Sequence, residues 1–176
     1  DTNPKKISWN RNLKQDLEKY KVHSFINGNI VTGHYRPFCK QELYFDKPFI
    51  ERPGLSPVFF PNSTLENIVI CVSPSPNDGL SLLISNKIAN LHFNGDTQCF
   101  PLYYYEELST TQTDLFNTDP SQRYRCHDAI SDFIHSRAVD QFGKSVTKED
   151  IFYYVYGFLH SPTYRETYAN DLKKML

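Results

Sequence analysis

The spacing of hydrophobic positions divides the chain into a helical start, a β-rich middle and a helical end. At the start, Trp9, Leu13, Leu17 and Tyr20 recur at helical spacing behind Ser8, a residue type that often caps helices. The pattern predicts an amphipathic helix over residues 8–21. Residues 1–21 hold six Lys or Arg against three acidic residues. We interpret this excess as a solvated helix face, with phosphate contact as the alternative.

Between Asn27 and Tyr105, short β-rich runs alternate with turn clusters that are rich in Gly, Pro, Asn and Ser. The run 67–72 is almost entirely apolar, which is typical of a central strand covered on both faces. The gaps between runs are too short for crossover helices, so we expect antiparallel or mixed pairing. The predicted strand runs are Ile30–Thr32, Glu42–Phe45, Asn67–Val72, Leu80–Ile84 and Ala89–Phe93.

Residues 106–124 are polar, contain Asp119-Pro120 and predict a linker. After it, apolar residues recur at helical spacing over Ala129–Phe142, which Gly143 would end. Thr147 and Asp150 resemble a capping box that opens a second helix. Ser161-Pro162 would open a third, lined by Tyr164, Tyr168, Leu172 and Leu176. The fold class is therefore α+β: an N-terminal helix, an antiparallel or mixed β-sheet core and a C-terminal three-helix bundle.

Charge and cysteine content narrow the function classes. The 19 Lys and Arg balance 20 Asp and Glu to a net charge of −1, so the basic excess of a typical free-standing nucleic-acid binder is missing. Any DNA contact must come from a local patch or be shared with attached domains. Four scattered cysteines without a C-x-x-C pair argue against zinc and favour a reduced, cytoplasmic protein. No apolar stretch approaches the ~20 residues that span a membrane.

Catalytic signatures are missing from the sequence. There is no phosphate-binding G-x-x-x-x-G-K-[ST] loop, no G-x-G-x-x-G and no G-x-S-x-G. We interpret Cys126-His127-Asp128 as a helix start; a hydrolase using Cys126 or His127 is the competing hypothesis. His160 at a helix end is more typical of a capping cation. We expect no catalytic residue, no metal site and no cofactor. The chain begins without Met and stops inside a helical pattern, so we expect a piece of a larger protein.

Several blocks carry a family resemblance when they are taken in order. They are Tyr35-Arg36-Pro37-Phe38 with Leu43-Tyr44-Phe45-Asp46, Glu51-Arg52-Pro53-Gly54, Phe60-Pro61 with Glu66-Asn67, Cys99-Phe100-Pro101-Leu102-Tyr103-Tyr104-Tyr105, and the aromatic helix pair 151–165. Together they resemble the C-terminal specificity region of type ISP restriction-modification enzymes. These are large bacterial polypeptides with a nuclease, a helicase-like translocase, an adenine methyltransferase and a target-recognition domain.

The resemblance implies a domain organisation and a function. Residues 1–34 would follow the methyltransferase, 35–105 would form a β-rich recognition subdomain, 106–124 a linker and 125–176 a helical subdomain. The chain would be a non-catalytic DNA target-recognition module that positions the methyltransferase and translocase on a short sequence of double-stranded DNA. The parent would be the enzyme. The alternative is a structural coupling domain that docks on the methyltransferase with little direct DNA contact.

Candidate DNA contacts follow from the chemistry of base and phosphate recognition. Arg and Lys suit guanine edges and phosphates, and Arg36 and Arg52 sit beside Pro in locally rigid geometry, with Lys40 close by. Their alternative role is pairing with the acids 42, 46 and 51 to fasten the sheet. Lys144 and Lys148 would add positive charge at the helical subdomain, or merely solvate it. The run 103–105 could stack on a base, although alternation along a strand favours core packing.

Overall fold

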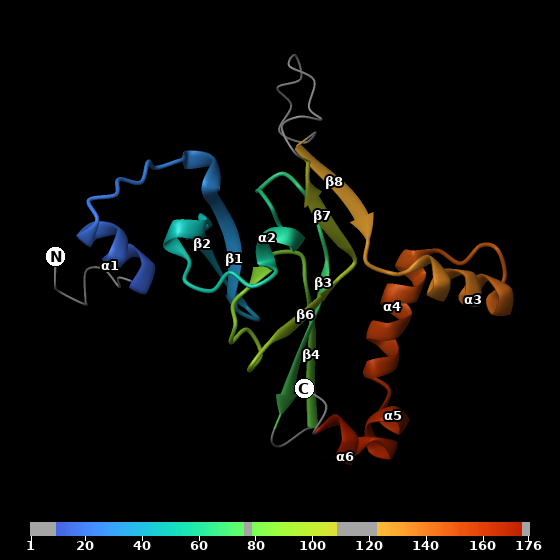
Figure 1. Ribbon diagram of the computed structural model, residues 1–176. Coiled ribbons are helices and arrows are strands. Elements are labelled where there is room, and N and C mark those ends of the chain that lie inside the picture. Colours follow the sequence, from blue (N-terminus) through green and yellow to red (C-terminus); the bar gives the residue numbers. More distant parts are fainter. Residues whose placement is uncertain (1–9, 76–78, 109–122, 174–176) are drawn as a thin grey trace.

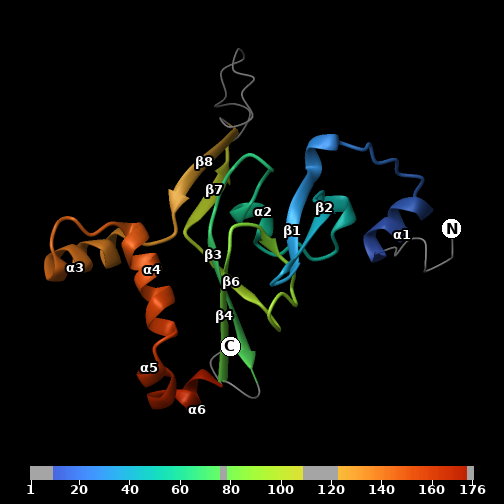
Figure 2. The ribbon, with the colours of Figure 1, turned by 180° about the vertical axis from the view of Figure 1, so that it is seen from behind.

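The computed structural model describes residues 10–75, 79–108 and 123–173 of the chain, and in this part the strands pair into three small sheets flanked by short helices (Figure 1). The β-rich middle lies between the N-terminal helix on one side and the C-terminal helices on the other, as both ribbon views show (Figures 1 and 2). The predicted α+β class is confirmed.

The first sheet has the order β2-β1-β5. Strand β1 (Ile30–Arg36) pairs antiparallel with β2 (Cys39–Tyr44) and parallel with the short β5 (Ile88–Ala89). Pairing is therefore mixed, as expected. The predicted run 89–93 is mostly turn rather than strand, because the backbone N–H of Phe93 bonds back to the Asn90 carbonyl at 2.9 Å and closes a turn.

The second sheet has β3 (Val69–Ser75) at its centre, between β4 (Gly79–Ser85) and β6 (Gln98–Pro101). Both neighbours pair with it antiparallel. Alternate β3 side chains belong to separate hydrophobic clusters, with Val69 and Cys71 on one face and Ile70 and Val72 on the other. The predicted central strand, covered on both faces, is confirmed.

Each cluster joins β3 to a different part of the fold. The first contains Val31, Phe59, Phe60, Ile88 and Phe93, and so ties β3 to the first sheet and to α2 (Ser56–Phe59). The second ties β3 to β4 and the C-terminal helices through Leu80, Leu82, Leu102, Phe152 and Leu172.

A two-stranded ribbon replaces the ends of the predicted linker. Strand β7 (Tyr103–Glu107) pairs antiparallel with β8 (Tyr124–Asp128). Residues 106, 107 and 124 are thus strand; of the remaining linker, residues 109–122 lie outside the described residues. The interpretation of residues 126–128 as a helix start is wrong, because pairing with β7 draws them into β8.

The C-terminal helices are α3 (Asp132–Phe142), α4 (Lys148–Leu159), α5 (Pro162–Thr167) and α6 (Ala169–Leu172). Helix α3 begins after its cap Ser131, so positions 129 and 130 precede it. The predicted third helix is divided at Tyr168, and Leu176 lies outside the described residues. None of the residues of α3, all of which the structure describes, is buried. These helices contact the second sheet mainly through Phe152 and Leu172.

The N-terminal helix α1 (Arg11–Glu18) starts later than predicted, with Asn10 as its cap. The Asn10 carboxamide accepts a hydrogen bond from the Leu13 N–H at 2.8 Å and donates to the Phe49 carbonyl at 3.0 Å. The latter bond fastens α1 to the short 3-10 helix η2 (Lys47–Phe49). A second such turn, η1 (Asn27–Asn29), leads into β1.

Candidate nucleic-acid interface

A tight turn joins β1 to β2 and places an aromatic ring in solvent. Pro37 and Phe38 form the turn, and the register shifts so that Tyr35 is an extra residue before Arg36 pairs with Cys39. The Phe38 side chain is 100% exposed. We name residues 35–40 the hairpin tip. Pro fixes φ near −65° and so stiffens the turn.

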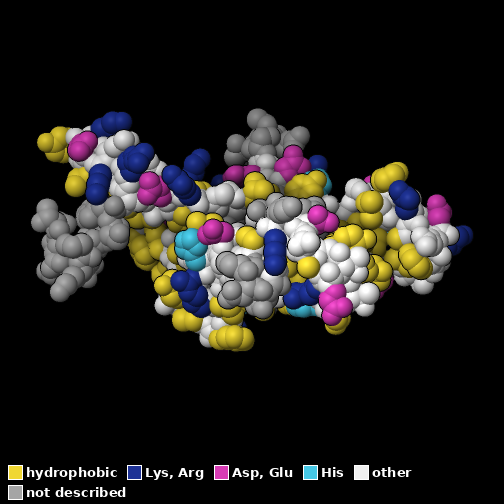
Figure 3. Space-filling model, turned by 90° about the horizontal axis from the view of Figure 1, so that it is seen from below, with side chains coloured by type: hydrophobic (Ala, Val, Ile, Leu, Met, Phe, Trp, Pro, Cys, Tyr) yellow, Lys and Arg dark blue, Asp and Glu magenta, His cyan; other side chains and the backbone are white. Residues whose placement is uncertain are grey.

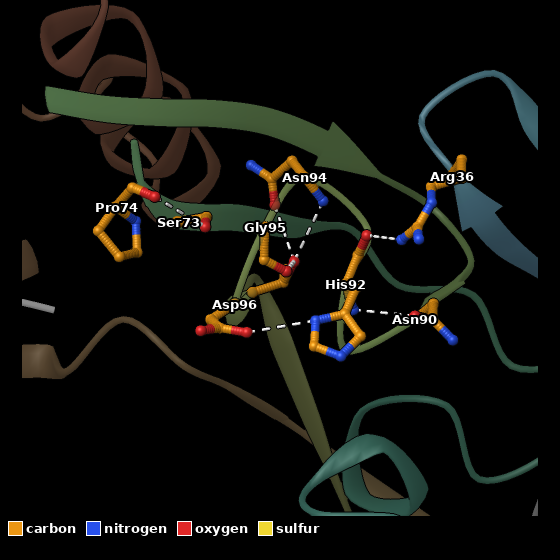
Figure 4. A network of polar contacts seen from close by, with 9 residues as sticks. Arg36, Ser73, Pro74, Asn90, His92, Asn94, Gly95 and Asp96 are labelled. Carbon is orange, nitrogen blue, oxygen red and sulfur yellow. Dashed lines mark hydrogen bonds and ion pairs between the residues drawn. The ribbon is translucent and has the colours of Figure 1, made fainter. Parts of the chain in front are cut away.

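Arg36 anchors the hairpin tip to the loop 90–97 between β5 and β6. Its Nη1 donates to the carbonyl of His92 (Figure 4). Its guanidinium carbon lies 4.9 Å from the centre of the Tyr35 ring. Within the described residues, no ion pair joins Arg36 or Arg52 to the acids at 42, 46 and 51. A guanidinium has five N–H donors, so Arg36 keeps capacity for further partners.

The loop 90–97 is itself clamped to the second sheet. The Asn94 amide donates to the carbonyls of Cys71 and Ser81 at 3.3 and 3.2 Å. Gly95 lies so close to Ser73 that an added Cβ would stand 2.1 Å from its hydroxyl oxygen. His92 faces Asp96 at 3.2 Å across the same loop (Figure 4). The hairpin tip therefore has a rigid support.

A groove of about 860 Å³ runs beside the hairpin tip, and its wall is largely apolar. Its lining includes Tyr35, Arg52, Leu55, Phe100 and Tyr104, which come from both sheets and the ribbon. Most of these side chains are more than a third exposed. The groove thus combines aromatic surface with the Arg52 cation, a combination suited to stacking and to polar contact with a base.

His34 lies on the same wall, with its Nδ1 2.8 Å from the Ser85 hydroxyl and its ring stacked on Phe93. Burial, with the positive charges of Lys40 and Lys87, holds the pKa of His34 below its ordinary value of 6.5. Ser85 already donates to the Lys87 carbonyl at 2.8 Å. The pair is therefore a structural contact between β1 and β4 rather than a nucleophile and its base.

The five predicted contact residues fall into separate groups. Lys40 is exposed on β2 opposite His34, near Arg36, and Arg52 lies on the groove. Lys144 and Lys148 belong to the helical side, away from β1 and β2 in both ribbon views (Figures 1 and 2). Lys144 is exposed, whereas the Lys148 ammonium pairs with Asp128 at 2.9 Å and Asp132 at 2.6 Å. These carboxylates raise the pKa of Lys148.

The tyrosine run 103–105 alternates as a strand should. Tyr105 is buried, and its hydroxyl donates to the Glu66 carbonyl. Burial raises the pKa of Tyr105 to about 12. Tyr104 is 40% exposed and stacks on His127, with ring centres 4.9 Å apart at 12°. Of the three tyrosines, Tyr104 alone lines the groove.

Other chemistry is sparse in the described part. Among residues 10–75, 79–108 and 123–173, no three His, Cys, Asp or Glu side chains gather closely enough to hold a metal ion. No helix in that part combines the length and apolarity needed to cross a bilayer. Cys126 is an exposed residue, yet partial desolvation of its sulfur raises the pKa of the thiol. His127 faces Glu106 at 3.0 Å. A raised thiol pKa opposes a nucleophilic role.

Charge on the face seen from below is mixed (Figure 3). Lys and Arg side chains are interspersed with Asp, Glu and hydrophobic side chains over the middle of this face, with a closer gathering toward the N-terminal end. Sequence reasoning missed the exposure of Phe38 and the anchoring role of the 90–97 loop. The Asn94-Gly95-Asp96 cluster was recognisable as a turn, but its contact with Ser73 depends on the tertiary fold.

Comparisons with known proteins give a consistent result. The sequence matches the family described as the Type ISP C-terminal specificity domain over residues 1–176. No curated protein matches significantly. Several solved structures are also similar, among them the following three.

The structure of the ATP-dependent Type ISP restriction-modification enzyme LlaBIII bound to DNA has 29% identity and a TM-score of 0.77, covering 97% of this chain and 10% of that one. The DrdV–DNA complex has 31% identity and a TM-score of 0.78, covering 95% and 15%. A nuclease-deletion mutant of the Type ISP enzyme LlaGI with a DNA substrate mimic has 30% identity and a TM-score of 0.71, covering 97% and 11%. The chain thus spans a tenth to a seventh of their length, and it belongs to the Type ISP C-terminal specificity domain family.

Proposed function

We propose that this domain is the DNA target-recognition module of a bacterial type ISP restriction-modification enzyme. The observation that carries the proposal is the whole-chain family match together with similarity to three structures that contain DNA. On this proposal the domain is not catalytic. It positions the methyltransferase and the ATP-dependent translocase and nuclease of a cytoplasmic parent enzyme on a short DNA sequence.

The hairpin tip and the groove supply the contacts. Arg36 and Arg52 are assigned to base edges or phosphates, and Lys40 to a phosphate. The anchoring of Arg36 to His92 supports this role, because a pre-positioned guanidinium loses little freedom on binding. Lys144 is assigned to a more distant phosphate. For Lys148 the two carboxylate partners favour a smaller contribution.

Charge reversal in the full-length protein tests the proposal. We expect R36E, K40E and R52E together to abolish preference for the cognate duplex over a scrambled one, in binding titrations at two salt concentrations. The control is K14E, K19E and K21E, which changes net charge equally on and beside α1. It should weaken binding to both duplexes alike, because phosphate contacts carry no sequence information. Unchanged sequence preference in the first variant would refute the contact assignment.

The helical side favours a second, compatible role as a docking surface for the methyltransferase. Its exposed large apolar residues include Phe133, Ile134, Phe142, Tyr154 and Phe158. Among them, Tyr154 and Phe158 stack with ring centres 6.0 Å apart, and grouped exposed aromatic side chains typically mark protein interfaces. On this proposal, the predicted three-helix bundle completes its packing against the partner. We expect Y154E with F158E to abolish association with the isolated methyltransferase region, whereas R36E would leave it intact; equal association of all forms would exclude the docking role.

A further inference from the structure

We propose that Phe38 is a wedge, which inserts its ring between neighbouring bases of bound DNA while Arg36 and Lys40 contact phosphates on either side. This inference rests on the proposed function and extends it. It assigns an apolar contact that deforms the duplex, in addition to polar contacts that read or hold it. Apolar side chains such as Phe and Leu insert between base steps and kink DNA in this way.

The exposure of Phe38 has no explanation within the domain. Its ring is 100% exposed, whereas Phe59, Phe60 and Phe93 are all buried in the first cluster. Scattered exposed hydrophobic residues are common, so exposure alone does not assign a role. The position of Phe38 in the fold does assign one. Phe38 lies in a two-residue turn at the end of the hairpin, where its ring can enter a narrow space ahead of the backbone.

The base of the turn is held in place. Strand β1 is paired on both sides, by β2 and by β5. Arg36 reaches the His92 carbonyl, and the 90–97 loop that carries His92 is fixed by Asn94 and by the close approach of Gly95 to Ser73 (Figure 4). Separating two stacked bases requires that the backbone carrying the inserted ring stay in place. The anchored turn below Phe38 meets this requirement.

The positive charges of Arg36 and Lys40 favour DNA, rather than an apolar pocket on a protein, as the partner of Phe38. Arg36 and Lys40 flank Phe38 on the two paired strands that the turn joins, and the backbones of such strands lie about 5 Å apart. The minor groove is about 6 Å wide, so cations at this spacing can reach phosphates on both of its edges. The acidic residue of the supporting loop, Asp96, faces His92 at 3.2 Å. An apolar pocket on a protein would gain nothing from two cations around the ring.

The test uses the full-length protein and a cognate duplex labelled at both ends for energy transfer, with 2-aminopurine placed at each position in turn. We expect wild type to shorten the end-to-end distance and to raise the fluorescence of the probe at one step. F38A should lose part of both signals and bind about 5- to 150-fold more weakly, the range for loss of one stacking contact. F38L should retain much of the distortion, because Leu also serves as a wedge. V22A, at an exposed apolar position between α1 and η1 to which no contact is assigned, should match wild type.

The outcomes separate the inference from the proposed function. If F38A binds as tightly as wild type and deforms the duplex equally, the wedge is refuted while target recognition stands. If F38A binds more weakly but gives identical DNA signals at saturation, Phe38 contributes to binding without opening a base step, and the wedge is again refuted. If wild type shows no preference for any duplex sequence, the proposed function itself fails and the inference falls with it.

Discussion

The side chain of Asn67 bonds to both backbone polar groups of Tyr103. Its Oδ1 accepts from the Tyr103 N–H at 3.1 Å, and its amide nitrogen donates to the Tyr103 carbonyl at 2.6 Å. The same side chain also donates to the Phe59 carbonyl at 2.9 Å and accepts from the Ile68 N–H at 2.8 Å. One buried carboxamide thus joins α2, the start of β3 and the start of β7.

We predict that Asn67→Ala lowers the free energy of unfolding by ~2–4 kcal/mol, because buried backbone groups would lose partners. Asn67→Asp should be nearly as harmful, since a carboxylate cannot donate to the two carbonyls. Urea denaturation measures both. Asn62→Ala is the control: its Oδ1 caps an exposed turn at Thr64, so its loss should have a smaller effect. Equal stability of wild type and Asn67→Ala would contradict the prediction.

Two glycines should respond oppositely to replacement by alanine. At Gly95, φ is +132° and the new Cβ would collide with Ser73, so Gly95→Ala should cost ~1–3 kcal/mol of stability. At Gly157, in the interior of α4, nothing lies within 4 Å, and Gly157→Ala should stabilise by about 0.5–1 kcal/mol through helix propensity. Thermal unfolding of both variants checks the pair. The same sign for both would contradict the geometry described.

We predict that Lys148 stabilises the helical side of the domain and that this stabilisation is electrostatic. Lys148→Met keeps the aliphatic stem but removes the ion pairs to Asp128 and Asp132, so Tm should fall at low salt. The difference should shrink near 1 M salt, where the screening length is about 3 Å. Lys144→Met is the matched control at an exposed position of the loop that precedes α4, and it should leave Tm unchanged. A salt-independent loss would point to packing instead.

His34 should make stability depend on pH. Its folded pKa is lowered, so the unfolded chain binds more protons between the folded value and 6.5. The stability that its neutral ring contributes is present in full above pH ~6.5 and is lost as pH falls through the folded pKa. His34→Gln should therefore flatten the unfolding free energy between pH 7 and 5, relative to wild type, in urea titrations. Parallel pH profiles would exclude this role.

Sequence reasoning succeeds where local chemistry decides the structure. The apolar run 67–72 predicted a strand covered on both faces, and the alternate side chains of β3 do pack into two separate clusters. Thr147 and Asp150 form the capping box, with the Asp150 carboxylate accepting from the Thr147 N–H at 2.9 Å. Ser161 caps the helix that Pro162 opens. In each case the side chain acts on backbone groups within a few residues.

Sequence reasoning fails where distant pairing overrides local preference. Residues 124–128 are polar and lack a clear alternation, yet they become β8 because β7 offers a partner edge. The sequence does not reveal the exposure of Phe38 either, because Phe is among the residue types most often buried. Only the turn geometry shows that its ring has no neighbour to pack against. The candidate contacts were chosen by residue type. Only the fold shows that some of them lie near the hairpin tip and groove and the others on the helical side.

A strand that serves two hydrophobic interiors constrains both halves of the domain together. Because the side-chain period of β3 is two, slippage of its pairing by one residue would exchange the occupants of both interiors at once. The hairpin-bearing part and the helix-bearing part should therefore melt in a single cooperative step. A displacement that a bound partner causes in one half would therefore be transmitted through β3 to the other half.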